Sequence, residues 1–169
     1  LELVGATHHY SSDVEDSRFM LGPVNLRIGP AEIVFIIGGN GSGKTTLAML
    51  LLGLYEAESG SVRLNGQNVN SSNIMHYRQF FSAVFADFHL FEHLLASGHG
   101  NEPEASEHAD ERTRRYLHAL GMGHKVKVVD GKFSTINLST GQRKRLALVL
   151  SYLEDRPIYL FDEWAADQD

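Results

Sequence analysis

A glycine-rich loop that ends in lysine and threonine is the strongest signal in the chain. Residues 38–45 read Gly-Gly-Asn-Gly-Ser-Gly-Lys-Thr and fit the pattern G-x4-G-K-[ST]. An apolar run at 32–37 precedes the loop, and a segment with helical character at 45–54 follows it. A strand buried on both faces, followed by a glycine loop and a helix, is typical of parallel sheets. The sequence therefore predicts an α/β fold built around this loop.

The composition of the loop suits a bound triphosphate. Glycines free the backbone to aim several N–H groups at one anion, and the following helix presents the positive end of its dipole. We expect the Lys44 ammonium to reach the β- and γ-phosphates and the Thr45 hydroxyl to ligate Mg²⁺. An accidental glycine-rich turn is the alternative, but the flanking strand and helix favour nucleotide binding. The predicted ATP-binding residues of the loop are Gly38, Gly39, Asn40, Gly41, Ser42, Gly43, Lys44, Thr45 and Thr46.

Two adjacent acids follow a second apolar run, at 158–161. Asp162, at the C-terminal end of a strand beside the phosphate loop, is placed to hold Mg²⁺ through its water shell. Glu163, the next residue, would point to the side opposite Asp162 and act as general base on the attacking water. By themselves the two acids are ordinary loop residues, but a phosphate loop in the same chain favours a catalytic metal site. The predicted catalytic residues are Glu163 and Lys44, and the predicted metal ligands are Thr45 and Asp162.

Bulk composition narrows the classes of partner. The formal net charge of −6 argues against nucleic-acid binding, because such domains usually carry a basic face. The absence of cysteine excludes disulfides, thiol catalysis and cysteine-ligated metals. No apolar run approaches the roughly 20 residues that cross a bilayer, and no signal peptide heads the chain. We therefore expect one soluble globular domain over residues 1–169.

Hydrophobic periodicity predicts three parts within this domain. The N-terminal segment alternates in a way that favours short antiparallel strands, while the span 88–140 is the least sheet-like and is expected to form a small helical subdomain. Outside the loop region, strands are expected within 3–28 and at 61–66, 81–85 and 158–161, and helices at 107–120 and 140–154. The expected fold is a mainly parallel sheet core with an antiparallel β subdomain and a helical subdomain.

A third motif separates this chain from other nucleotide-binding proteins. Residues 138–142 read Leu-Ser-Thr-Gly-Gln and resemble the LSGGQ signature of ABC ATPases. With the loop and the acidic pair in this order, the chain resembles an ABC transporter nucleotide-binding domain, a P-loop NTPase of RecA-like fold. The resemblance implies a head-to-tail dimer in which the signature of one copy closes on the γ-phosphate held by the other. Ser139, Gly141 and Gln142 would take that role, with Thr140 replacing the usual central glycine.

The resemblance carries over to two further positions. Tyr10 resembles the A-loop aromatic that stacks on adenine; the alternative is a strand tyrosine with its hydroxyl at the surface. Residues 166–169 occupy the place of the D-loop, where Asp169 would help to align the facing subunits.

Three longer stretches, at 77–91, 138–147 and 162–169, narrow the resemblance to the cyclic-peptide and pyoverdine-type siderophore exporters of Gram-negative bacteria. It covers nearly the whole chain. It implies a six-helix membrane domain in the same polypeptide, and a position on the cytoplasmic face of the inner membrane. The implied cargo is a nonribosomal or cyclic peptide, or a siderophore precursor, and the implied ligands are ATP and Mg²⁺.

The chain also departs from the general ABC pattern. Ala86 occupies the place of the Q-loop glutamine, and its side chain can neither ligate nor hydrogen-bond. None of the nine histidines follows Asp162, although the resemblance places a switch histidine beyond the D-loop. We therefore expect a C-terminally truncated part of a longer protein, which binds MgATP but hydrolyses it slowly. His89 and His93 have i,i+4 spacing, but two such residues without a third favour ordinary polar side chains over a metal site.

Two other functions stay open at this point. A soluble ABC ATPase of DNA repair or chromosome organisation shares all three motifs, but a long coiled-coil insertion would separate its loop from its signature. Here Leu138 follows Lys44 by only 94 positions (138 minus 44), which favours a transporter. A degenerate regulatory module that does not hydrolyse ATP fits Ala86, whereas the intact lysine and acidic pair argue against it.

Overall fold

The computed structural model describes residues 1–12, 15–94 and 103–162. The chain divides into two compact units, Leu1–Phe81 and Ser82–Asp169. Within the described ranges, no helix combines the length and the apolar character that crossing a bilayer requires.

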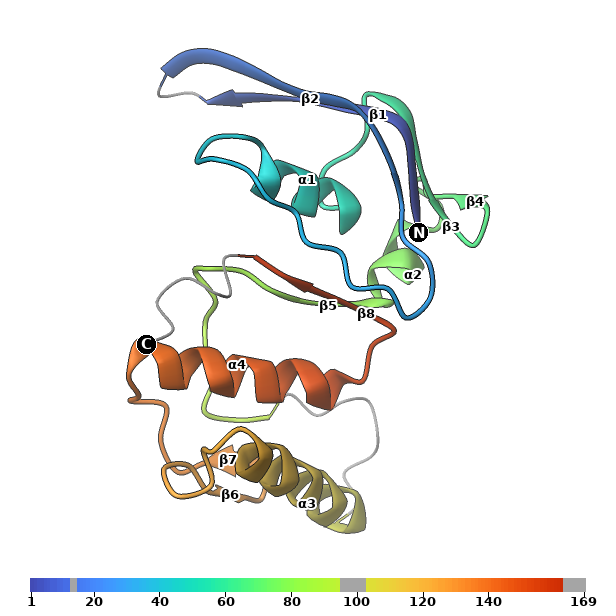
Figure 1. The fold of residues 1–169 in the computed structure, drawn as a ribbon. Coiled ribbons are helices and arrows are strands. Elements are labelled where there is room, and N and C mark those ends of the chain that lie inside the picture. The colour runs from blue at the N-terminus through green and yellow to red at the C-terminus, as the bar shows by residue number, and fades with distance from the viewer. Residues whose placement is uncertain (13–14, 95–102, 163–169) are drawn as a thin grey trace. The chain divides into compact units, whose positions relative to one another are not determined.

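The first unit is built on an antiparallel sheet of four strands in the order β2-β1-β3-β4. Two long strands form a hairpin, and β1 also pairs with β3 (Figure 1). The antiparallel strands expected within 3–28 are thereby confirmed, although they are two long strands instead of several short ones. The four strands are β1 Glu2–Ser12, β2 Glu15–Arg27, β3 Ser59–Leu64 and β4 Gln67–Asn68.

Helix α1, Lys44–Leu51, packs against this hairpin and supplies three residues of the unit's core. Its polar residues lie in the first turn and its apolar residues follow, so that the second half of the helix is buried. Strand residues that point to the same side complete the core. The buried residues are Leu3, Ala6 and Leu21 from the hairpin, Ala48, Leu50 and Leu51 from α1, and Leu52, Val62 and Tyr77 beyond them.

The short helix α2, Ile74–Arg78, holds the C-terminal end of α1. The buried Tyr77 hydroxyl donates a hydrogen bond to the Leu51 carbonyl oxygen. The Arg78 guanidinium donates to the Gly53 carbonyl oxygen from Nε at 3.1 Å and from Nη2 at 2.6 Å. Burial raises the pKa of the Tyr77 phenol well above its usual range. These bonds satisfy carbonyl groups that a helix end leaves without partners.

One expected strand is wrong. Residues 32–37 form no strand, and Ile33, Phe35 and Ile37 are 84%, 83% and 90% exposed. An apolar run becomes a doubly buried strand only where neighbouring strands complete its ladder on both sides. Within the part of the chain that the structure describes, this run has no strand partner. Apolar composition alone therefore did not determine its conformation.

The second unit contains two strands that run in the same direction side by side, β5 Phe81–Val84 and β8 Ile158–Phe161 (Figure 1). They agree closely with the strands expected at 81–85 and 158–161. A buried hydrogen bond of 2.8 Å between the hydroxyls of Ser82 and Ser151 ties β5 to helix α4, Thr140–Glu154. The expected helix at 140–154 is therefore confirmed at both ends.

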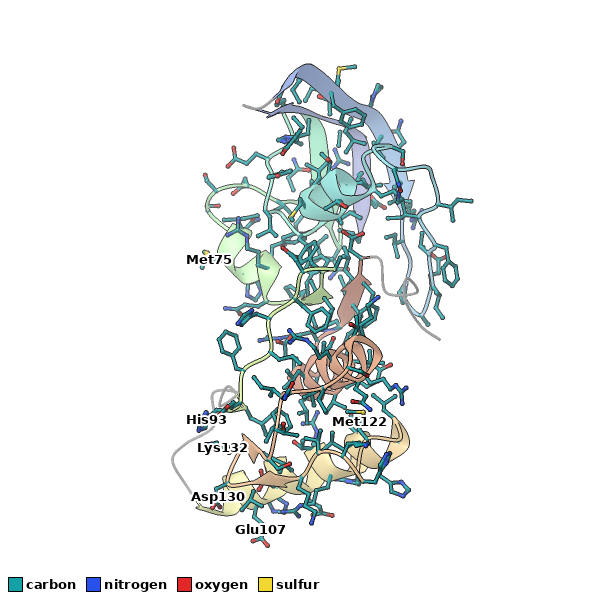
Figure 2. The ribbon with its side chains drawn as sticks, turned by 90° about the vertical axis from the view of Figure 1, so that its left-hand side faces the viewer. Met75, His93, Glu107, Met122, Asp130 and Lys132 are labelled. Carbon is teal, nitrogen blue, oxygen red and sulfur yellow. The ribbon has the colours of Figure 1, made fainter. Side chains whose placement is uncertain are left out.

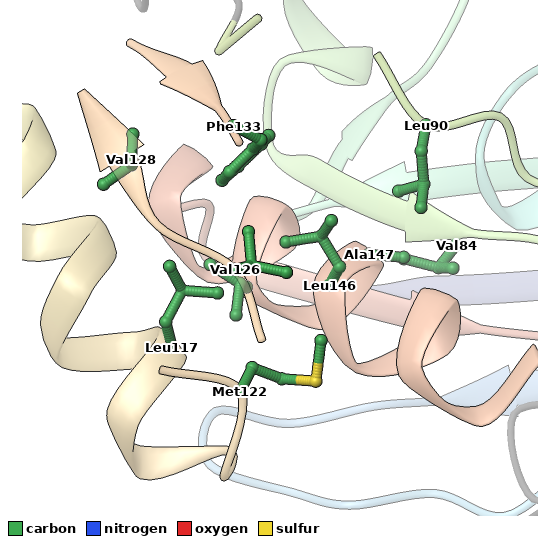
Figure 3. Packing of buried hydrophobic residues seen from close by; sticks show 10 residues of the cluster. Val84, Leu90, Leu117, Met122, Val126, Val128, Phe133, Leu146 and Ala147 are labelled. Atoms are coloured by element: carbon green, nitrogen blue, oxygen red, sulfur yellow. The ribbon is translucent and has the colours of Figure 1, made fainter. Parts of the chain in front are cut away.

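The core of the second unit lies between α4 and the elements that precede it (Figure 3). Helix α3, Pro103–Ala119, packs on α4, and a small hairpin is formed by β6 Val128–Val129 and β7 Lys132–Phe133. The α3 helix lies inside the span expected to be helical. The buried cluster comprises Val84, Leu90, Leu117, Met122, Val126, Val128, Phe133, Leu146, Ala147 and Val149.

The bond from Tyr77 to the end of α1 can be tested by removing one atom. Tyr77→Phe leaves the Leu51 carbonyl without this donor, so the free energy of unfolding should fall by about 1–3 kcal/mol in urea denaturation. Tyr10→Phe is the matched control, because its side chain is exposed, and it should change stability by less than about 0.5 kcal/mol. Equal stability of the Tyr77→Phe variant and the parent would contradict the assigned bond.

Candidate functional site

The predicted phosphate loop lies in an exposed turn that opens α1. Residues 38–42 are exposed, and Gly43 and Lys44 are half-buried. Gly43 is the N-cap of the helix and has a left-handed φ of 86°, which glycine adopts without steric cost. It contributes no side-chain hydrogen bond to the first turn. The N–H groups of that turn therefore receive no acceptor from the cap, an arrangement that suits a bound anion.

Lys44 lies across the loop that precedes it. Its Nζ donates hydrogen bonds to the carbonyl oxygens of Gly38 at 3.0 Å and Gly39 at 2.9 Å. A phosphate oxygen carries more negative charge than these carbonyl groups and makes a stronger, charge-assisted bond with an ammonium. In the first turn of α1, Thr45 is exposed and Thr46 is half-buried. The structure thus gathers the expected phosphate ligands into one loop.

Tyr10 lies on the hairpin that packs against this loop. It is 45% exposed, and its cross-strand partner on β2 is Phe19. Directly paired residues of antiparallel strands present their side chains on the same face. An exposed ring on the loop side of the hairpin can offer a flat apolar face to a purine base.

The opposite face of the hairpin is held by a polar pair next to Tyr10. The Glu58 carboxylate accepts a 3.0 Å hydrogen bond from the His9 backbone N–H, and its other oxygen contacts His9 Nδ1. These bonds, the backbone one first, lower the pKa of the Glu58 carboxyl group. The pair fixes β1 to the start of β3 and leaves the Tyr10 ring to face the loop side.

In the second unit, the chain leaves β5 and β8 at the same edge. The backbone N–H of Asp162, which follows β8, donates to the Val84 carbonyl oxygen at the end of β5, at 2.9 Å. Ala86 and Asp87 follow β5 and are exposed. Carboxyl ends of parallel strands are where open α/β sheets bind ligands. Asp162 therefore lies at the carboxyl end of a strand, as the sequence predicts, and its role as a metal ligand stays a prediction.

The signature residues open helix α4. Ser139 is its N-cap: the Ser139 Oγ accepts from the Gln142 N–H at 3.4 Å, and the Gln142 Oε1 accepts from the Ser139 N–H at 3.1 Å. This reciprocal capping box pins the first turn. Ser139 and Thr140 are exposed, and Gly141 has open space around the position of a side chain. The start of α4 therefore presents N–H groups and a hydroxyl to solvent.

Two expected site residues, the general base Glu163 and the D-loop acid Asp169, lie outside the described residues. Among the described residues, no group of three His, Asp or Glu side chains that could hold an ion is formed around His89 and His93 or elsewhere. His93 instead forms a β-bridge with Lys132, and the two lie close together (Figure 2).

Sequence reasoning missed the residue that joins the hairpin to the loop. A Cβ atom built on Gly43 would lie 2.6 Å from Phe19 Cζ, so the Phe19 ring is in direct contact with this glycine. Only the hairpin register could have indicated it, by placing Phe19 opposite Tyr10. The sequence between the two strands, Asp13-Val14, contains no glycine and so offers no turn signal that would set this register.

Comparison with known proteins agrees with these motifs. The protein-family model described as ABC transporter matches residues 21–166. The ATP-binding protein SyrD of Pseudomonas syringae pv. syringae is 47% identical over 171 residues. That alignment covers 100% of this chain and 29% of SyrD, so the chain spans less than a third of its relative.

Two solved structures share the fold. A bacterial Atm1-family ABC exporter with ATP bound is 21% identical with a TM-score of 0.76, over 99% of this chain and 30% of that chain. A dimeric ATP-binding cassette in a post-hydrolysis state, bound to ADP and Pi, is 22% identical with a TM-score of 0.74, over 99% of this chain and 75% of that chain. The predicted P-loop NTPase fold class is thereby confirmed.

The capping box at Ser139 yields a stability prediction. Ser139→Ala removes the side-chain acceptor of the first turn, so the free energy of unfolding should fall by about 0.5–2 kcal/mol in chemical denaturation. Ser139→Asp keeps an N-cap acceptor and should retain most of the stability of the parent. If Ser139→Ala and Ser139→Asp lose equal stability, the hydroxyl does not act as the cap.

Proposed function

Since the chain belongs to the ABC transporter family, we propose that it is the ATP-binding and ATP-hydrolysing domain of an exporter. The observation that carries the proposal is the loop 38–45, exposed over residues 38–42, with a helix start behind it that has no side-chain cap and the Lys44 ammonium folded over it. Backbone N–H groups, a helix dipole and the Lys44 ammonium lie together there. This set of groups is what a triphosphate requires.

The remaining ATP contacts are proposed from the sequence resemblance and from the surroundings of each residue within its own unit. The exposed ring of Tyr10 stacks on the adenine, on the loop side of the hairpin. Thr45 in α1 and Asp162 after β8 supply oxygen ligands, the kind that Mg²⁺ prefers. A bound Mg²⁺ would neutralise charge on the β- and γ-phosphates. Glu163, next to Asp162, is the proposed general base for the attacking water.

A second copy of the chain completes the site in this proposal. The capped, exposed start of α4, with Ser139, Gly141 and Gln142, closes on the γ-phosphate held by the partner's loop. The dimeric state of one structural neighbour supports this arrangement. Asp169 is proposed to align the two copies. A helix N-terminus and a hydroxyl from across the interface would favour the charged γ-phosphate and therefore make closure depend on ATP.

The transported cargo is proposed from the sequence resemblance and from the relatives. The stretches at 77–91, 138–147 and 162–169 resemble exporters of cyclic peptides and siderophore precursors, and a structural neighbour is an exporter. We infer a membrane domain in the same polypeptide, a position on the cytoplasmic face of the bacterial inner membrane, and a nonribosomal peptide or siderophore precursor as cargo. Nucleic acid is not a proposed partner, because the chain carries a net charge of −6.

The alternatives receive less support. A soluble ATPase of chromosome organisation would carry a coiled-coil insertion, and the loop and the signature are too close in sequence for one. A degenerate module would have no need of a lysine that is held over the phosphate loop.

ATP binding is tested first by thermal melting of the chain with and without MgATP. A ligand that binds only the folded state must raise its stability, by about 2.7 kcal/mol at a hundred times the dissociation constant. The parent should therefore melt at a higher temperature with MgATP, and Lys44→Ala should lose this rise. Lys125→Ala, an exposed lysine elsewhere, is the control and should keep it. No rise in the parent would sink the proposal.

The role of Glu163 is tested separately from binding. Glu163→Gln preserves the size of the side chain but removes the proton acceptor, so phosphate release should slow by about 10²-fold or more. The rise in melting temperature with MgATP should persist, because the phosphate loop is untouched. Hydrolysis at the parent's rate in this variant would show that another group takes the proton.

A further inference from the structure

We propose that Phe19 is a positioning residue of the nucleotide site: its ring holds the strand of Tyr10 in register with the phosphate loop, so that base and triphosphate bind as one ligand. The inference rests on the proposed ATP binding at residues 38–45. The inference concerns how binding of the base is coupled to binding of the triphosphate. It adds Phe19, which no sequence motif identifies, to the residues of the proposed site.

The first support is the contact between Phe19 and Gly43. A side-chain carbon on Gly43 would lie 2.6 Å from Phe19 Cζ, 2.8 Å from Phe19 Cε1 and 3.3 Å from Leu21 Cδ1. Gly43 is the residue that starts α1, so the aromatic ring rests on the backbone immediately before Lys44. Any displacement of the hairpin toward or away from the loop must change this contact. The close packing therefore fixes the distance between β2 and the first turn of α1.

The second support is the register of the hairpin. Tyr10 and Phe19 are paired across β1 and β2, and neighbouring strands lie about 4.8 Å apart. Both rings stand on the same face, and Leu21, two residues beyond Phe19, is buried on that face too. Tyr10, the proposed adenine-stacking residue, thus lies on the strand next to that of Phe19, which touches the phosphate loop. No other element needs to intervene between base contact and phosphate contact.

The third support is a second anchor at the far end of α1. The His8 ring stacks on Tyr55, with centroids 4.6 Å apart and planes inclined by 14°, and His8 Nδ1 lies 3.0 Å from the Glu56 carbonyl oxygen. His8 is two residues before Tyr10 on the same face of β1. The hairpin is therefore held at the start of the helix by Phe19 and after its end by His8. Two anchors prevent the hairpin from pivoting about either one.

A rigid spacing between two half-sites raises affinity for a ligand that spans them. When one half binds, the other is presented at high effective concentration, and the gain is lost if the half-sites move independently. Stacking on Tyr10 should therefore strengthen nucleotide binding only while Phe19 holds the strand. A ligand that consists of phosphates alone should not depend on Phe19.

The test is a double-mutant cycle on the 169-residue chain, with dissociation constants measured by calorimetry for MgATP and for magnesium tripolyphosphate. Tyr10→Ala and Phe19→Ala should each weaken MgATP binding by roughly tenfold, the order expected for one lost stacking contact. The double variant should also be weaker by roughly tenfold, not a hundredfold, because the two residues act as one unit. Tripolyphosphate affinity should change less than about twofold throughout.

Two further variants make the test selective. Met20→Ala is the matched control: Met20 follows Phe19 on β2 but points to the opposite face, where it is 52% exposed, and its loss should leave both affinities unchanged. Phe19→Leu keeps an apolar side chain but cannot reach as far as the ring, so it should reproduce the effect of Phe19→Ala even where the alanine variant folds poorly.

The outcomes separate this inference from the function on which it rests. A parent chain that binds neither MgATP nor tripolyphosphate overturns both. If the parent binds both ligands, three results overturn the role of Phe19 alone. These are a hundredfold loss of MgATP affinity in the double variant, an equal loss of affinity for MgATP and tripolyphosphate, and an unchanged MgATP affinity in Phe19→Leu.

Discussion

The first unit depends on the contact between its hairpin and the first turn of α1. Gly43 has a left-handed backbone, and its lack of a side chain leaves room for the Phe19 ring. Any larger residue would collide with that ring and would also strain the backbone. The same glycine thus satisfies two constraints, the turn into the helix and the close approach of β2. The glycines of such loops are usually explained by the ligand alone, whereas here the protein's own packing requires one of them.

The alternation of side chains along the hairpin puts its packing residues on one face and a polar pair on the other. Residues that face α1 are apolar or aromatic, and Phe19, Leu21 and His8 pack there, while His9 and Glu58 form their polar pair on the outer side. Because side chains alternate between faces, a slip of one residue in register would bring the polar set inward. Burial of Leu21 and the stacking of His8 on Tyr55 oppose such a slip. The exposed position of Tyr10 is therefore a consequence of packing elsewhere on the strand.

The sequence predicted individual helices and strands better than it predicted which strands and side chains pair with one another. Helix α4 was predicted at both ends from the helical spacing of its apolar residues, and the structure adds a capping box of Ser139 and Gln142 at its start. Strands β5 and β8 were predicted from short apolar runs with clear limits. The run at 32–37 is also apolar, yet a strand needs neighbouring strands to pair with, and composition does not specify those. The Phe19–Gly43 contact joins residues 24 positions apart (43 minus 19) through a register that no turn motif announces.

Helices α1 and α4, whose N-termini are the proposed ligand contacts, differ in how their first turns are stabilised. Helix α4 has fifteen residues and a capping box, so its own side chains stabilise its start. Helix α1 has eight residues, no side-chain cap and no acid in its first turn. A helix that short is marginal in water by itself. The helix is therefore stabilised by the packing of its buried face against the hairpin, and by Tyr77 and Arg78, which satisfy carbonyl groups at and just beyond its C-terminal end. A short helix that begins without a side-chain cap must be stabilised by the surrounding fold, and in this chain β1, β2 and α2 provide that stability.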